Sequence, residues 1–246
     1  MERVTPPETW LDFLRWQAEQ TRDTCRYLAR RCSMRQGLLL DLACGRGDIS
    51  AWLAGTRPEL TILGLDHDLA VLPEPGGEFT PVCGAVDRLP LNDAVADYVL
   101  FHFALMWVET RNVLAEVRRV LKPGGWMLVC AEPDYSGMIS EPDPGDKRTM
   151  VQRLTRGIER VSGDPYLGSK LPRVIKEAGF MLADFGLSSR PRLYTREEWN
   201  DLERVFSFRT YFHPRSGPRW RNNLKRIIRK RPYLEFMPVF YALAQR

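Results

Sequence analysis

The sequence has few side chains of the kind that bind metal ions. It contains three histidines in 246 residues, and its five cysteines include no Cys-x-x-Cys pair. None of the histidines pairs with cysteines or carboxylates at the spacing of a metal site. The odd number of cysteines is also unlike a disulfide framework. We therefore expect no metal ion, and a reduced protein of the cytoplasm.

Long apolar runs are also missing. No stretch approaches the roughly 18 apolar residues of a membrane span. Residues 1–10 carry charges and prolines, which is unlike a secretory signal. The chain is nevertheless 44% hydrophobic, which is enough to build a substantial core. Its length suits one α/β domain with additions.

Positive charge is concentrated near the end of the sequence. The net charge is +5 and the sequence pI is about 9.0. A basic stretch can bind nucleic acid or an anionic surface, but the simpler interpretation is a solvated helix face, and we favour it. The residues are Arg215, Arg219, Arg221, Lys225, Arg226, Arg229, Lys230 and Arg231.

Short apolar segments alternate with segments of helical spacing. Leu38–Leu42 is a continuous apolar run, as expected for a strand buried on both faces. A helix over residues 109–121 ends at the Lys-Pro-Gly-Gly of residues 122–125, because proline cannot continue it. The alternation is typical of parallel βαβ units and predicts an α/β fold with a doubly wound sheet. Further strands are predicted at 61–65, 79–85, 97–101, 126–131, 180–187 and 238–243, and further helices at 8–35, 49–53, 150–161 and 171–178.

We expect residues 1–246 to form a single domain with four parts. Residues 1–35 are predicted to be an N-terminal helical cap, and residues 36–189 the ligand-binding core. Residues 190–235, which are basic and aromatic, are predicted to be an insertion that acts as a cap or as a homodimer contact. Residues 236–246 are predicted to be the final strand.

The first predicted strand leads into a glycine-rich turn and then a helix. In an open α/β sheet, ligands bind beyond the carboxyl ends of the strands, and Gly45 and Gly47 allow close approach to the backbone. A dinucleotide motif requires a third glycine, and here that position is Ser50. The carboxylate of Asp41 repels a pyrophosphate and suits an ammonium group. The turn therefore favours S-adenosylmethionine over a nicotinamide dinucleotide.

Two more carboxylates follow neighbouring strands. Asp66 closes the second strand, 19 residues after Gly47, where an acidic residue can accept both ribose hydroxyls. Asp87 follows the third strand, where a carboxylate can accept from an adenine amino group. Together with Asp41 and the glycines, these positions indicate an adenosyl ligand.

These motifs resemble the class I S-adenosylmethionine-dependent methyltransferases, in particular the type-11 branch related to ubiquinone and menaquinone biosynthesis. The resemblance covers residues 36–132 and includes Asp-x-Ala-Cys-Gly-x-Gly, Val-x-x-Leu-Pro after the third strand and Leu-Lys-Pro-Gly-Gly before the fifth. It implies a Rossmann-like sheet of seven strands in the order 3-2-1-4-5-7-6, with the last strand antiparallel. Many members have glycine at the position of Ala43, a small change.

The resemblance also implies roles for individual residues in binding S-adenosylmethionine. Asp41, Ala43, Gly45 and Gly47 are expected to hold the methionine end, and Asp66 the ribose. His67 is expected to pack against the adenine, with Asp87 and Arg88 flanking it. Phe101, at the end of the fourth strand, completes the expected cofactor contacts.

Methyl transfer requires the acceptor to lie in line with the methyl group, and a general base helps only if the acceptor loses a proton. His102, after the fourth strand, is the best candidate base; the alternative is a histidine that only packs. The candidate contacts of a small, largely apolar acceptor are Trp10, Phe103, Trp107, Glu132, Asp134 and Tyr135.

Two other functions remain open. The basic segment with interleaved aromatic residues suits an RNA methyltransferase, although the stretch after the fourth strand lacks an Asn/Asp-Pro-Pro-Tyr motif. The chain can also be a regulatory or partner protein that binds S-adenosylmethionine without turnover. A small-molecule methyltransferase is the preferred prediction.

Overall fold

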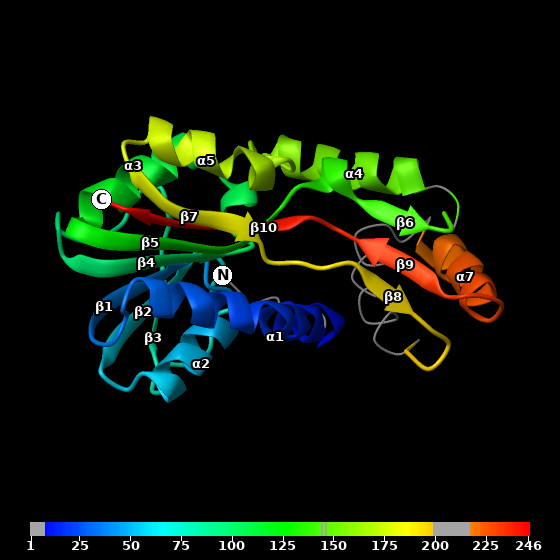
Figure 1. Ribbon diagram of the computed structural model, residues 1–246. Coiled ribbons are helices and arrows are strands. Elements are labelled where there is room, and N and C mark those ends of the chain that lie inside the picture. Colours follow the sequence, from blue (N-terminus) through cyan, green and yellow to red (C-terminus); the bar gives the residue numbers. More distant parts are fainter. Residues whose placement is uncertain (1–7, 144, 146, 199–216) are drawn as a thin grey trace.

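The computed structural model describes residues 8–143, 145, 147–198 and 217–246. A seven-stranded sheet forms the centre of the molecule (Figure 1). Its strands are β1 (Gly37–Leu42), β2 (Leu60–Asp66), β3 (Thr80–Cys83), β4 (Ala96–His102), β5 (Leu121–Pro133), β7 (Met181–Leu187) and β10 (Val239–Gln245).

The order across the sheet is β3-β2-β1-β4-β5-β10-β7. The pairs β1–β2, β2–β3, β1–β4 and β4–β5 are parallel. Strand β10 is antiparallel to both of its neighbours, β5 and β7. Counted within this sheet, the order is 3-2-1-4-5-7-6 with an antiparallel last strand, so the predicted topology is confirmed.

Helices cover both faces of the sheet (Figure 1). On one side lie α1 (Glu8–Arg31) and α2 (Asp48–Thr56), and on the other α3 (Thr110–Val120) and α5 (Leu167–Glu177). The sheet contributes buried side chains to a separate core on each side: Leu39 packs with α1 and α2, and Leu40 with α3 and α5. Because successive strand residues face opposite ways, both faces must be apolar, which explains the continuous run in β1.

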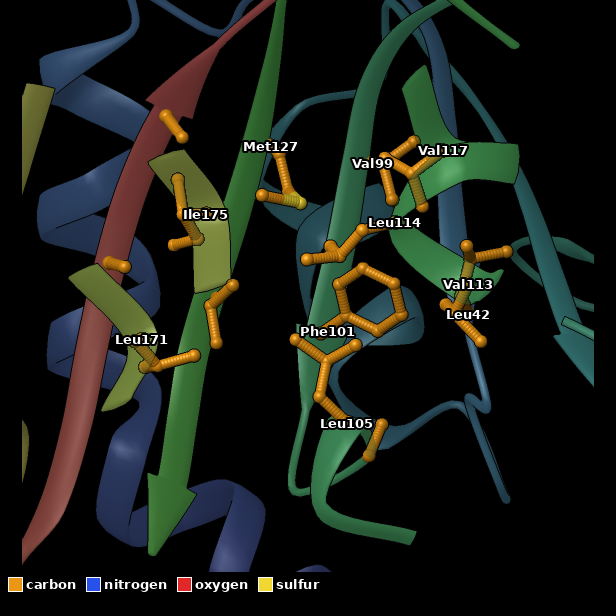
Figure 2. Packing of buried hydrophobic residues seen from close by; sticks show 14 of the residues in the cluster. Leu42, Val99, Phe101, Leu105, Val113, Leu114, Val117, Met127, Leu171 and Ile175 are labelled. Carbon is orange, nitrogen blue, oxygen red and sulfur yellow. The ribbon is translucent and has the colours of Figure 1, made fainter. Parts of the chain in front are cut away.

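Figure 2 shows the core on the α3 and α5 side. Phe101 of β4 lies among Leu42, Val113, Leu114 and Leu105, and all five side chains are buried. Burying a large apolar side chain contributes about 1.5–3 kcal/mol, so this cluster holds α3 firmly on the sheet. The carboxyl ends of β1 and β4 are thereby fixed relative to each other.

A second, three-stranded antiparallel sheet lies beside the main one (Figure 1). It consists of β6 (Ile139–Glu141), β9 (Tyr233–Phe236) and β8 (Arg192–Tyr194). Helix α7 (Gly217–Ile228) packs on it through Leu224 and Ile228. The sequence predicted an insertion at residues 190–235 but not these strands, and β6 comes from the segment assigned to the core. Their three or four residues are too short to show a clear alternating pattern.

Most predicted boundaries differ by a few residues from the observed ones. Strand β5 begins at Leu121, five residues earlier than expected, because Leu121 already pairs with Ala96 of β4 before the register shifts. Helix α4 (Lys147–Arg160) corresponds to the helix predicted at 150–161. Among the described helices, none is both long and apolar enough to cross a membrane.

Candidate active site

A cavity of about 770 Å³ opens at the carboxyl ends of the parallel strands. This size is typical of small-molecule and cofactor sites. Its walls come from the ends of β1, β2, β3 and β4, with α1 along one side. Ten of the predicted site residues line it: Asp41, Ala43, Gly45, Asp66, His67, Asp87, His102, Phe103, Trp107 and Tyr135.

Asp41 lies at the floor of the cavity and is 2% exposed. Its Oδ2 accepts a hydrogen bond of 2.7 Å from the hydroxyl of Ser50, which is on the first turns of α2. Burial raises the pKa of Asp41 to about 7, the Ser50 hydroxyl lowers it, and the nearby charge of Asp66 raises it. A cation placed in the cavity stabilises the ionised carboxylate and lowers this pKa.

The glycine-rich turn adopts left-handed backbone conformations at three positions. The φ angles are 56° at Ala43, 56° at Gly45 and 73° at Gly47. A Cβ atom on Gly45 would meet only Leu14 Cδ1, at 3.9 Å, so the backbone there is open to the cavity. A Cβ atom on Gly47 would overlap the ring of Phe79, and Gly47 does not line the cavity. The two glycines therefore serve different purposes.

Asp66, at the end of β2, braces the same turn. Its Oδ2 accepts from the backbone N–H of Gly45 at 2.8 Å, and its Oδ1 accepts from that of Asp68 at 2.9 Å. His67 Nδ1 lies 3.4 Å from Oδ1 of Asp66. Each carboxylate oxygen has a second lone pair, so Asp66 can hold the turn and still accept from a ligand.

The segment after β3 supplies one wall. Ala85, Val86 and Asp87 line the cavity, whereas Arg88 does not. Of the two residues predicted to flank the adenine, Asp87 therefore lies beside the cavity and Arg88 does not.

His102 lies at the end of β4 and borders the cavity. Its Nε2 is 2.7 Å from the hydroxyl oxygen of Thr21 on α1. Its ring packs edge-to-face against Phe103, with centroids 4.9 Å apart. Burial lowers the pKa of His102 to about 4, so the imidazole is neutral at pH 7.

Glu132 and Asp134 follow β5 but do not line the cavity. Glu132 is fully buried, and its carboxylate accepts from the backbone N–H groups of Ala104, Leu105 and Met106 at 2.9, 2.8 and 3.1 Å. Asp134 accepts from the backbone N–H and the hydroxyl of Ser136. Both carboxylates brace loops beside the cavity, and only Tyr135 of this segment borders it.

Two other predicted contacts, Phe101 and Gly47, also fall outside the cavity walls. Phe101 faces the α3 core, as described above, because it lies one residue before His102 and points to the opposite face. Gly47 instead leaves room for the ring of Phe79, which a Cβ atom at this position would overlap. The side chain of Trp10 is outside the described residues.

Aromatic and apolar side chains also line the cavity. They are Phe13 and Leu14 of α1, and Phe103, Met106 and Trp107 after β4. Phe103 has a φ of 53°, which is strained for an aromatic residue and is the kind of feature that clusters at functional sites. From α1 the sequence predicted only Trp10 as a site residue and missed Phe13, Leu14, Gln17 and Ala18. The only signal of these four was the polar Gln17 on the apolar face of the helix.

The described lining of the cavity is acidic. Its charged side chains are six carboxylates and the guanidinium of Arg46, which lies 3.9 Å from the carboxylate of Asp48. The carboxylates are those of Asp41, Asp48, Asp66, Asp68, Asp87 and Glu109. Such a cavity attracts cations and repels anions. Among the described residues, no cluster of histidine, cysteine and carboxylate side chains is suited to hold a metal ion.

Residues 40–129 match a family model described as a methyltransferase domain. A ubiquinone/menaquinone biosynthesis C-methyltransferase from Desulfotalea psychrophila is 40% identical over 103 residues, which cover 39% of this chain and 41% of that protein. The first curated relatives are matched over about two fifths of their length or less.

Solved structures of low sequence identity share the fold. A candidate methyltransferase from Bacillus halodurans C-125 superposes with a TM-score of 0.59 at 18% identity, covering 89% of this chain and 97% of the other. The geranyl diphosphate C-methyltransferase of Streptomyces coelicolor A3(2), crystallised with S-adenosyl-L-homocysteine, gives 0.54 at 12% identity and covers 90% and 77%. Residues 40–129 are therefore similar in sequence to a methyltransferase domain, and the order of the strands is that of the Rossmann-like fold of these solved structures.

Proposed function

We propose that the protein transfers a methyl group from S-adenosylmethionine to a small, largely apolar acceptor that is neutral or positively charged. The observation that carries this proposal is the continuity of the cavity. Its lining includes both the carboxylates of Asp41 and Asp66 around the glycine-rich turn and the aromatic rings of Phe103 and Trp107. A cofactor and an apolar acceptor therefore have room side by side.

The residues present fit this cofactor. Asp41 offers a buried carboxylate to the ammonium of the methionine moiety, and Gly45 leaves its backbone open to the ligand. Asp66 retains lone pairs for ribose hydroxyls, and the wall from Ala85 to Asp87 can flank the adenine. When bound, S-adenosylmethionine supplies a methyl group activated by a positively charged sulfur. The acidic walls favour that positive charge.

The charge of the cavity also restricts the acceptor. Arg46, the one arginine or lysine of the described lining, already lies 3.9 Å from the carboxylate of Asp48. A carboxylate or phosphate on the acceptor would face the acidic residues without a cationic partner of its own. We therefore expect acceptors such as phenols or amines to be preferred over organic acids.

His102 is proposed to contact the acceptor. It lines the cavity beside Phe103 and it is neutral at pH 7, so one ring nitrogen can accept a proton or a hydrogen bond. An RNA acceptor has less support, because the described basic residues of α7 do not line the cavity.

Calorimetric titration with S-adenosylmethionine, S-adenosylhomocysteine and NAD tests the cofactor. We expect micromolar binding of both adenosyl ligands, none of NAD, and a loss of at least tenfold in Asp66→Asn, with Asp23→Asn, an exposed position of α1 outside the cavity, as the control. A panel of neutral phenols, amines and matched carboxylates, incubated with methyl-labelled cofactor, then tests the acceptor. Absence of adenosyl binding would overturn the cofactor assignment, and a preference for carboxylates would overturn the acceptor class.

A further inference from the structure

We infer that Thr21 of α1 is a positioning residue that holds His102 in the tautomer with its proton on Nε2, so that Nδ1 accepts a hydrogen bond from an O–H or N–H group of the acceptor. The inference rests on the proposed function for the identity of the acceptor, but not for the tautomer. It gives α1, which already lines one side of the cavity, a residue that acts through His102.

The hydrogen-bond partners of the Thr21 hydroxyl determine the tautomer. The oxygen lies 3.0 Å from the backbone carbonyl of Gln17 and 2.7 Å from Nε2 of His102. A carbonyl can only accept, so the single hydroxyl proton must point to Gln17; otherwise two oxygens would face each other at 3.0 Å without a proton. The hydroxyl oxygen then accepts from His102, and Nε2 must carry the proton.

A threonine that donates to the carbonyl four residues earlier is a common arrangement within helices. The carbonyl of Ala18 lies 3.3 Å from the same hydroxyl and is a second acceptor on the same side. Both carbonyls therefore direct the hydroxyl proton away from the imidazole.

The other ring nitrogen is left for a ligand. Among the described residues, no group forms a hydrogen bond with Nδ1 of His102. The atom is also not among the fully buried polar atoms that lack a partner, so it remains accessible. His102 borders the cavity, so this atom is reached from the cavity. The ring of Phe103 packs edge-to-face against the imidazole and restricts its rotation.

The backbone around His102 is also fixed. The N–H of Phe103 donates to the carbonyl of Ala131 at 2.8 Å, and Glu132 accepts from the next three backbone N–H groups. The imidazole is thus held by β5 through the backbone and by α1 through Thr21. Such preorganisation favours one geometry of the acceptor.

The tautomer defines the chemistry available to the acceptor. A neutral Nδ1 can receive the proton of an acceptor hydroxyl or amine as that atom's lone pair bonds to the methyl carbon. The electron pair of the broken carbon–sulfur bond stays on sulfur, which becomes neutral, and the proton passes from Nδ1 to water. An acceptor atom without a proton gains nothing from this arrangement.

Nitrogen NMR of protein labelled at histidine measures the tautomer directly, without turnover. We expect a pyridine-type shift for Nδ1 and a pyrrole-type shift for Nε2 of His102, assigned with His102→Gln. Thr21→Ser keeps the hydroxyl and should keep this pattern, whereas Thr21→Val should produce a mixture of tautomers. Thr24→Val is the matched control, because Thr24 is on the same helix and bonds to Ser188 at 2.8 Å instead.

Activity provides a second readout. With an O–H or N–H acceptor, Thr21→Val should lower kcat by about tenfold to hundredfold while the KM for S-adenosylmethionine changes little, consistent with the usual size of proton-transfer effects. Thr21→Ser should restore most of the rate, and Thr24→Val should retain it.

A proton on Nδ1 in the wild-type protein would overturn the inference, as would an unchanged tautomer in Thr21→Val. If Thr21→Val does not fold, the wild-type and Thr21→Ser spectra still decide. Failure of the proposed function appears differently: the expected tautomer would be present in a protein that does not bind the cofactor or methylate any acceptor.

Discussion

Glu132 and Leu105 are joined by a hydrogen bond of 2.8 Å between a fully buried carboxylate and a backbone N–H. Two further N–H groups, those of Ala104 and Met106, bind the same carboxylate. The bond ties the end of β5 to η1 (Leu105–Trp107), the short 3₁₀ helix that carries part of the cavity wall.

Replacing this carboxylate should destabilise the protein without touching the ligand. In Glu132→Gln, the side-chain N–H₂ group would face one of the backbone N–H donors, and a buried unsatisfied donor costs about 1–3 kcal/mol. Urea unfolding measures the change, with the exposed Glu141→Gln on β6 as the control, for which we expect less than about 0.5 kcal/mol. Equal effects in the two variants would contradict the bracing role.

Cofactor affinity should depend on pH through Asp41. Because burial raises the pKa of Asp41 to about 7, the free protein holds a proton there below pH 7, and the cationic cofactor must displace it. Affinity should therefore rise with pH, by up to about tenfold per unit below pH 7, and level off above it. Titrations in buffers of different ionisation enthalpy should show one proton released at pH 6.

Removing the Ser50 hydroxyl provides the matched test of this pH dependence. Ser50 lowers the pKa of Asp41 through its hydrogen bond, so Ser50→Ala should move the midpoint to higher pH. The same raised pKa implies that Asp41 contributes less to folding stability as pH rises from about 4 to about 7, because the unfolded chain releases the proton first. An affinity that is constant from pH 5.5 to 8.5 would rule out this role of Asp41.

The two glycines of the turn should respond differently to alanine. Both have positive φ angles, so each substitution costs roughly 1–2 kcal/mol in backbone strain. Gly47→Ala should cost about 1–3 kcal/mol more, because its Cβ meets the ring of Phe79. Phe79→Leu in the Gly47→Ala background should recover part of that excess, and no such recovery is expected for Gly45→Ala. Denaturant unfolding of Gly45→Ala and Gly47→Ala, each with and without Phe79→Leu, measures how strongly each glycine position is coupled to Phe79.

Ala43 gives a prediction of the opposite sign. It has a φ of 56°, where glycine is less strained, so Ala43→Gly should be neutral or stabilising by up to about 1 kcal/mol. Ala51→Gly, inside α2, is the control and should destabilise by about 1 kcal/mol. Thermal unfolding compares the two, and equal losses would show that the turn is not strained at Ala43.

The sequence was sufficient to predict the sheet and the glycine-rich turn after its first strand. The run Leu38–Leu42 and the turn after it carry local signals, namely continuous apolarity, glycines and a carboxylate at the end of a strand. Those signals depend on neighbouring residues only. The structure brings Asp41, Gly45 and Asp66 together at one end of the cavity.

The remaining site residues depend on contacts between distant segments. The direction in which Phe101 and Glu132 point follows from the register of β4 and β5, and a shift of one residue reverses it. The contact between Gly47 and Phe79 joins residues 32 positions apart and has no local pattern. Thr21 and His102 are 81 positions apart, so neither predicts the other.

Strand β10 follows all the other described strands in the sequence, yet it lies in the interior of the sheet between β5 and β7. Among the described strands of that sheet, β7 pairs with β10 alone, so it cannot join the sheet until β10 has been synthesised and inserted. Contacts between such distant segments slow folding, because the chain must close a long loop first. During synthesis, β5 therefore remains an open edge until β10 has emerged.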